Sequence, residues 1–146
     1  AIIDSDNTLY LYDGDQFAFK RIADNVMATA FSDDNKKLAW HTKNEIHVYY
    51  LKDILIQPKK KVGDTELITR LSRPITGITW FSYDNEHIFF AAEKKIQFIE
   101  LDGRDHRNVY DVADAAQTIR MSYSNYDDHL YFLDGSLLKK VSLFKI

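Results

Sequence analysis

A pattern that occurs three times constrains this chain more than any other feature of its sequence. Segments that begin at Phe31, Phe81 and Tyr123 each carry an aromatic residue, a serine, a turn rich in Asp and Asn, a short apolar run, a tight turn and a second apolar run. The first two segments start 50 residues apart and the last two start 42 residues apart. A repeat of about 40 to 50 residues that holds several short strands is typical of the four-stranded blades of a β-propeller, so we expect an all-β, propeller-type fold.

The repeat is out of phase with the ends of the chain. The segment 2–15 aligns with the segment 38–53, which places Leu9 opposite Ile46 and Ile96. When the strands of a blade are lettered A to D from the propeller axis to the rim, the chain reads BCD, ABCD, ABCD and ABC. We therefore expect one domain, 1–146, of about four antiparallel blades, the second of which is lengthened by an insertion at 52–64. The blades are expected at approximately 1–23, 24–73, 74–115 and 116–146.

The apolar runs of the repeat indicate strands that are covered on both faces. In a strand over 46–51, Ile46, Val48 and Tyr50 would point to one face, and Tyr49 and Leu51 would point to the other. Both sets are apolar, whereas a strand of a sheet with one solvent-exposed face alternates apolar and polar residues. The runs are too short for helices and lack helical spacing. An all-β sandwich is the alternative architecture. The strands are expected at 1–4, 8–13, 16–23, 25–31, 37–42, 45–51, 65–71, 75–81, 87–92, 95–101, 107–111, 117–123, 129–133 and 137–143.

Turn residues and composition agree with a sheet protein. Aromatic residues make up 14% of the chain, which suits pleated, half-buried surfaces. Asp-Gly pairs at 13–14, 102–103 and 134–135 are hairpin signals because glycine accepts a positive φ. Only the segment 111–117 favours a turn of helix.

The composition also excludes several classes of function. The chain has no cysteine, which excludes disulfides and cysteine-based zinc sites. The net charge of −3, with both signs spread along the chain, predicts no nucleic-acid binding. No apolar stretch approaches the roughly 18 residues of a membrane-spanning helix, so we expect no membrane insertion by this segment. The chain begins at Ala1 and not at Met, so we expect it to be a piece trimmed from a longer protein.

Three stretches, 36–53, 65–90 and 99–112, resemble the WD40-like repeats of bacterial β-propellers of the TolB type. More closely, they resemble the propeller-like region of bacterial PEGA-domain proteins. The family's Ser-Pro-Asp-Gly turn is replaced by sequences without Pro or Gly at Ser32, Ser82 and Ser124, so we expect wider turns. The resemblance implies an exported or envelope-associated bacterial protein and supplies no catalytic residues.

No motif predicts a catalytic residue, a cofactor or a metal site. The five glycines form neither a nucleophile elbow nor a phosphate-binding loop. His87 and His129 share one repeat position at the start of strand B, which favours packing or a turn hydrogen bond over a metal site. The acidic pairs lack the glycine and glutamate of a calcium loop and suit turns instead. The other histidines are His41, His47 and His106, and the acidic pairs are Asp4/Asp6, Asp33/Asp34 and Asp127/Asp128. The run Lys59–Lys61 is expected to be a solvated charge run, with contact to an acidic partner as the alternative.

These observations favour a non-enzymatic binding or scaffolding module in the bacterial cell envelope. An open arc of blades exposes apolar sheet faces at both ends, so we expect self-association, further blades from a longer chain, or a protein partner. A dimer of four-blade halves is one concrete form, and a closed four-blade monomer is its alternative. The competing class is an enzyme, a hydrolase or lyase whose catalytic residues lie elsewhere. The inner segments 26–31, 76–81 and 118–123 offer it only Arg120 and several threonines.

Overall fold

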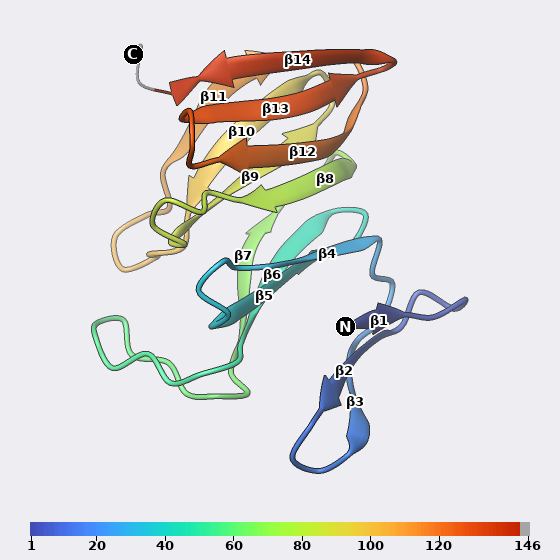
Figure 1. Ribbon diagram of the computed structural model, residues 1–146, viewed down its shortest axis with the longest axis vertical. Coiled ribbons are helices and arrows are strands. Elements are labelled where there is room, and N and C mark those ends of the chain that lie inside the picture. The colour runs from blue at the N-terminus through green and yellow to red at the C-terminus, as the bar shows by residue number, and fades with distance from the viewer. Residues whose placement is uncertain (144–146) are drawn as a thin grey trace.

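The computed structural model describes residues 1–143, except for the side chain of Ile119, and contains four antiparallel sheets (Figure 1). Each sheet lies within one of the four predicted blade ranges and is called here by that blade's number. The last three residues of the predicted fourth blade, 144–146, lie outside the described part. Blade 1 holds β1 (Ile2–Ile3), β2 (Leu9–Asp13) and β3 (Ala18–Ala23). Blade 2 holds β4 (Ala28–Phe31), β5 (Lys37–His41), β6 (Glu45–Tyr50) and β7 (Thr65–Arg70). Blade 3 holds β8 (Ile75–Trp80), β9 (His87–Ala92), β10 (Lys95–Glu100) and β11 (Val109–Asp114), and blade 4 holds β12 (Thr118–Ser124), β13 (His129–Asp134) and β14 (Leu137–Ser142).

The blades follow one another in an open arc. The strands of each sheet are hydrogen-bonded in sequence order, and the first strands of blades 2, 3 and 4 lie beside one another. Blades 1 and 4 lie at opposite ends of the molecule (Figure 1). The chain therefore forms part of a propeller, and both the β-sandwich and the closed four-blade ring are wrong.

Apolar residues on both faces of the inner blades hold the arc together. All five residues of β5 are buried, as expected for a sheet that is covered on both sides. One cluster, which includes Trp40 and Leu9, lies between blades 1 and 2. Another, which includes Phe81 and Tyr123 at 4.7 Å between ring centroids, lies between blades 3 and 4. Burial of these side chains in sheet-to-sheet contacts is the main stabilising term of the fold.

Asparagine takes the place of glycine in the A–B turns. Asn35 and Asn85 have φ of 56° and 57°, and Asp128 has φ of 55°. Asn and Asp tolerate this left-handed region better than other non-glycine residues. The turn from Ser32 closes in four residues, with the Asn35 amide donating to the Ser32 carbonyl at 3.0 Å. The wider turn expected here is therefore wrong, because Asn35 supplies the positive φ.

One local prediction fails. The segment 111–117 has no helical turn, because β11 continues to Asp114 by pairing with β10, with Lys95 opposite Asp114. The three Asp-Gly pairs each lie where two consecutive antiparallel strands are connected, as expected, and in the two-residue turn 135–136 the glycine has a positive φ of 62°. In the β2–β3 turn the positive φ belongs to Phe17, and the pair at 102–103 lies in a longer loop. In the segment 111–114, pairing with a neighbouring strand overrides local preference.

Candidate functional site

The outer face of blade 1 is an uncovered apolar surface. Side chains alternate between the faces of a strand, so Leu9 and Leu11 pack toward blade 2 while Tyr10 and Tyr12 point away from it. We call the outward set Ile2, Tyr10, Tyr12 and Phe19 the first end face. Ile2, Tyr12 and Phe19 are 52%, 49% and 55% exposed.

The first end face is continuous across its strands. Ile2 lies opposite Tyr10 in the pairing of β1 with β2, and Tyr12 lies opposite Phe19 in the pairing of β2 with β3. The rings of Tyr12 and Phe19 are 5.2 Å apart between centroids. Ile2, Tyr10 and Phe19 line a shallow hollow of about 290 Å³. Such a patch on a soluble protein is a mark of an interaction surface.

The outer face of blade 4 has an apolar centre and two cations. Phe132 and Leu130 pack toward blade 3, whereas Tyr131 and Leu133 point away from it. The set Arg120, Tyr131, Leu133, Leu138 and Lys140 is called here the last end face. Leu133 lies opposite Leu138, which is 69% exposed, and Lys140 Nζ lies 5.8 Å from the centroid of the Tyr131 ring. Arg120, which the sequence places on an inner segment, thus lines a depression of about 190 Å³ on this outer face.

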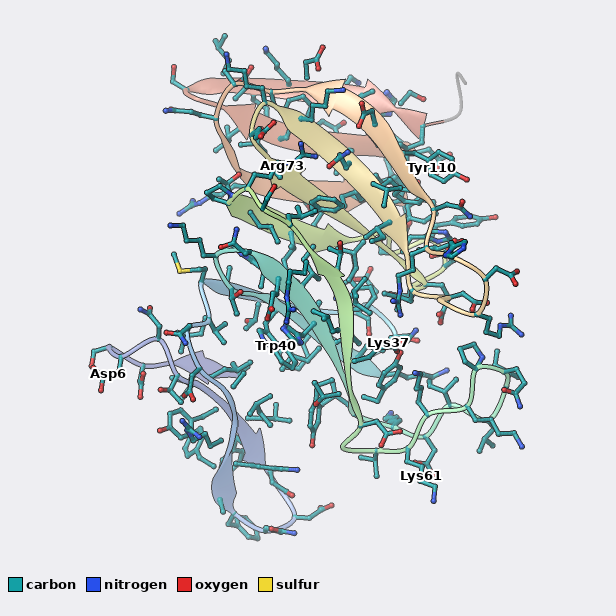
Figure 2. The ribbon with its side chains drawn as sticks, turned by 180° about the vertical axis from the view of Figure 1, so that it is seen from behind. Asp6, Lys37, Trp40, Lys61, Arg73 and Tyr110 are labelled. Atoms are coloured by element: carbon teal, nitrogen blue, oxygen red, sulfur yellow. The ribbon has the colours of Figure 1, made fainter. Side chains whose placement is uncertain are left out.

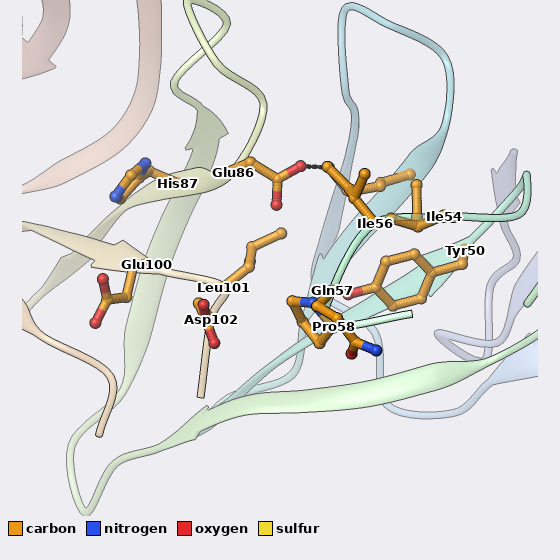
Figure 3. Close-up of a pocket in the computed structure, with 11 residues that line it drawn as sticks. Tyr50, Ile54, Ile56, Gln57, Pro58, Glu86, His87, Glu100, Leu101 and Asp102 are labelled. Carbon is orange, nitrogen blue, oxygen red and sulfur yellow. Dashed lines mark hydrogen bonds and ion pairs between the residues drawn. The ribbon is translucent and has the colours of Figure 1, made fainter. Parts of the chain in front are cut away.

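A pocket of about 220 Å³ lies between blades 2 and 3, under the insertion 52–64 (Figure 3). Tyr50, Ile56 and Pro58 form one wall. The other wall is formed by Leu101 and by three carboxylates, that of Glu86 before β9 and those at the end of β10. At its floor Lys37 Nζ contacts Glu86 Oε1 at 2.5 Å and donates to the Asn85 carbonyl at 2.8 Å. Lys37 and Trp40, both on β5, lie in the middle of the arc (Figure 2). The remaining lining residues include Glu100 and Asp102.

A carboxylate network fastens the insertion beside this pocket. Glu66 accepts contacts from Lys60 Nζ at 2.7 Å, Arg107 Nη2 at 2.6 Å and the Tyr50 hydroxyl at 3.0 Å. Burial and the adjacent Glu66 charge raise the pKa of the Tyr50 hydroxyl, which stays a hydrogen-bond donor. Lys60 also lies over the Tyr50 ring, with Nζ 5.5 Å from its centroid. The lysine run of the insertion is therefore not simply solvated, since Lys60 is an internal ion-pair partner.

The repeat-related histidines make turn hydrogen bonds. His87 Nδ1 lies 2.7 Å from Asp84 Oδ2, and its ring stacks on Phe98 at 4.6 Å between centroids. His129 Nδ1 lies 2.5 Å from the carbonyl oxygen of Asp127. Blade 2 carries Lys37 at this same position, the start of strand B, and its role was missed by sequence reasoning. The sequence signal that could have found it is its position in the repeat, because Lys37 follows Asn35 by two residues just as His87 follows Asn85.

The acidic pairs serve their own turns. Asp4 Oδ1 accepts from the amides of Asp6 and Thr8, and Asp34 Oδ1 accepts from Ser32 Oγ at 2.6 Å. Within residues 1–143, no group of three or more His, Asp or Glu side chains is placed to hold a metal ion. Among the same residues, no helix has the length and apolar character needed to cross a membrane.

One hollow near the inner strands was not expected from the sequence. It has a volume of about 530 Å³ and is lined by Met27, His41, Lys43 and Thr76, among others. His41 is buried, and burial lowers the pKa of its imidazole. Its Nδ1 is already engaged, at 2.8 Å from the Thr42 carbonyl oxygen. The inner segments 26–31, 76–81 and 118–123 contain no histidine, and His41 of β5 is the histidine that lines this hollow.

Comparisons with known proteins identify the fold. No protein-family model matches the chain, and no curated protein matches it by sequence. The β-propeller domain of Cps50 (Swd1) from Myceliophthora thermophila superposes with a TM-score of 0.70 at 13% identity, over 94% of this chain and 46% of that one. A provisionally assigned 6-phosphogluconolactonase from Bacteroides uniformis gives 0.57 at 10% identity, over 91% and 43%. Hydrazine synthase of Kuenenia stuttgartiensis gives 0.59 at 17% identity, over 92% and 40%.

The chain thus spans less than half the length of each of these structures. At such identities the likeness carries the fold and not the activity. The resemblance to TolB-type and PEGA-domain repeats stays a prediction. The chain has the β-propeller fold, in the form of an open arc of blades.

Proposed function

We propose that this chain is a non-enzymatic binding or scaffolding module that acts through the sheet faces of its two end blades. The observation that carries the proposal is the pair of apolar end faces, on which Phe19 is 55% and Leu138 is 69% exposed. Inside the molecule the equivalent faces of blades 2 and 3 are covered by neighbouring blades. Covering an end face with a similar surface would gain about 25 cal/mol for each Å² of apolar area that leaves water.

The resemblance of residues 36–53, 65–90 and 99–112 to bacterial envelope propellers supports a place for this module in an envelope protein. In that setting the blades would present a binding surface next to other parts of an envelope assembly. Fractionation of cells that carry the full-length protein tests this placement, since recovery of the protein in the cytoplasm alone would contradict it.

The association state of the purified chain tests the binding function. Size-exclusion chromatography with light scattering at micromolar concentrations is expected to show a species larger than the 17.1 kDa monomer. Replacing Phe19→Asp and Leu138→Asp together should return the chain to the monomer. A wild-type chain that elutes cleanly as the monomer across this range would contradict association through the end faces.

An enzyme is the second candidate, and the hollow beside His41 is the observation that favours it. A screen with ester, peptide and glycoside substrates addresses it directly. We expect no turnover. Turnover that is lost in a folded His41→Ala variant would overturn the non-enzymatic proposal and locate the site.

A further inference from the structure

We propose that the first end face of one copy docks on the last end face of a second copy, so that the two arcs join head to tail. This inference rests on the proposed function, and it names both the partner and the pairing of the surfaces. The alternative pairings, first face on first face and last face on last face, are distinguished by charge and by experiment.

The two end faces have the chemistry of surfaces that already pack together in this molecule. Between blades 3 and 4, the Tyr123 ring meets the rings of Phe81 and Phe89, with centroid separations of 4.7 Å and 5.9 Å. The first end face presents side chains of the same kinds, namely two tyrosines, a phenylalanine and an isoleucine. The last end face offers Leu133 and Leu138 beside the Tyr131 ring. The cluster between blades 3 and 4 also holds Leu130 of blade 4 with the aromatic rings of blade 3, so aromatic side chains already pack with aliphatic ones where two blades meet.

Charge favours the pairing of unlike faces. Residues 1–24, which are blade 1 and the residue after it, carry five aspartates against Lys20 and Arg21. Three of these aspartates lie in the two turns that border the first end face, among them Asp6 at the tip of its turn (Figure 2), and Asp13 ends β2 beside one of them. The first end face itself carries one cation, Arg21 opposite Tyr10, and Asp24 pairs with it at 2.5 Å. The last end face carries Arg120 and Lys140, and residues 116–143 hold three cations against three aspartates, so this end is neutral whereas residues 1–24 have a net charge of −3.

A head-to-tail contact brings these opposite charges together. A contact between two first faces would bring two aspartate-rich borders together, and a contact between two last faces would bring Arg120 and Lys140 of each copy together. Like charges across an interface oppose association, and unlike charges favour it.

The length of the arc suits closure by two copies. A head-to-tail contact generates a ring when the rotation closes and a filament when it does not. This chain covers 46% of the propeller domain of Swd1, so two copies supply about one such propeller. Each copy then contributes one first face and one last face, and neither apolar face remains exposed. We therefore expect a closed dimer.

Single-face variants test the pairing. Phe19→Asp blocks only the first end face, and Leu138→Asp blocks only the last. Both side chains are more than half exposed, so the substitutions leave the cores between blades intact. Head-to-tail docking predicts that neither variant alone forms the closed dimer and that each shows at least a tenfold weaker association than wild type. An equimolar mixture of the two variants is expected to form a heterodimer, through the intact first face of one and the intact last face of the other.

The controls separate this proposal from the proposed function. Leu55→Asp, in the insertion and 80% exposed, adds the same charge away from both faces and should assemble as wild type does. Circular dichroism of each variant establishes that it is folded. If the wild type assembles but one of the single-face variants still dimerises fully alone, like faces pair and the head-to-tail proposal fails while the binding function stands. A wild-type monomer overturns both.

Charge reversal gives an independent readout. Arg120→Glu with Lys140→Glu should weaken the dimer at low salt and reverse its salt dependence, because added salt then screens a repulsion and no longer an attraction. Unchanged affinity and unchanged salt dependence in this variant would overturn the charge complementarity on which the pairing rests.

Discussion

The Nζ atom of Lys37, on β5 of blade 2, lies 2.5 Å from Oε1 of Glu86, the residue before β9 of blade 3. The lysine side chain is 2% exposed, whereas that of the glutamate is 57% exposed. Nζ also lies 5.9 Å from the centroid of the Trp80 ring. A buried ammonium of one blade thus makes its close contacts with groups of the next, so the contact couples the positions of the two blades.

Replacement of Lys37 should therefore destabilise the fold. Lys37→Met keeps most of the buried volume and loses only the polar contacts, so we expect a cost of about 1–2 kcal/mol in the free energy of unfolding. Lys37→Ala also leaves a cavity and should cost about 3 kcal/mol. Urea unfolding followed by tryptophan fluorescence measures both.

The matched control is Lys36→Met, one residue away. Lys36 Nζ lies 4.0 Å from Asp34 Oδ2, and its side chain is 48% exposed. Exposed pairs contribute little, so this change should stay within about 0.5 kcal/mol of wild type. Equal effects at the two positions would show that the buried contact is not the source of the stability.

The turn at Asn35 predicts a different order of substitutions. Asn35 has φ of 56°, a conformation that glycine adopts freely and alanine adopts at a cost. We expect Asn35→Ala to destabilise the chain by about 1 kcal/mol and Asn35→Gly to change it by less than about 0.5 kcal/mol. Thermal unfolding of the two variants in parallel tests this order, and an alanine variant as stable as the glycine variant would contradict it.

Tyr123 predicts a loss of stability at alkaline pH. Burial, followed by the charge and hydrogen bond of Asp128, raises the pKa of the Tyr123 hydroxyl from 10.0 to about 12. Because the folded state holds this proton more tightly than the unfolded state, the contribution is fully present below pH 10 and is lost as the pH rises toward about 12.

Comparison with Tyr123→Phe isolates this effect. The variant has no hydroxyl to titrate, so its urea midpoint should fall less steeply than that of wild type in the same alkaline range. Parallel slopes for the two proteins would mean that Tyr123 does not contribute to the alkaline transition.

The contacts of Glu66 are expected to protect the insertion 52–64 from proteolysis. Glu66→Gln removes the charge that Lys60, Arg107 and the Tyr50 hydroxyl share, and we expect a cost of about 1–3 kcal/mol. The insertion loses the ion pair to Lys60, so limited trypsin digestion should cut faster at Lys59–Lys61. The control is Glu93→Gln, because the Glu93 side chain is 59% exposed and its contact with Arg73 is 3.3 Å long. Equal cleavage rates in both variants would show that Glu66 does not hold the insertion.

Most of the strand positions could be predicted from the sequence because each strand has a strong local signal. The predicted strand 87–92 agrees with β9 at both ends, since an aromatic and aliphatic run follows a turn rich in Asp and Asn. The strand β11 was placed too early and ended too soon, because its last residues are strands only by pairing with β10. Alanine and aspartate have no strand preference of their own.

The candidate surfaces could be predicted only in outline. The phase of the repeat indicates that an incomplete blade lies at each end, and hence that an apolar face is exposed there. It does not indicate that Arg120 lies on the outer face of blade 4, because that depends on the bulge between Thr118 and Met121 in the pairing of β12 with β13. The contact between Lys37 and Glu86 was also beyond prediction, since 49 residues separate the two in the chain.

The sequence by itself determined the repeat, the approximate strands and the phase of the repeat relative to the two ends of the chain. It could do so because turn chemistry and strand preference act over a few residues. Only the tertiary structure decided that the blades form an open arc, that Lys37 is buried against Glu86, and that Phe19 and Leu138 face outward at its two ends. The physical reason is that alternation along a strand assigns residues to two faces, while the stacking of blades decides which of those faces is covered.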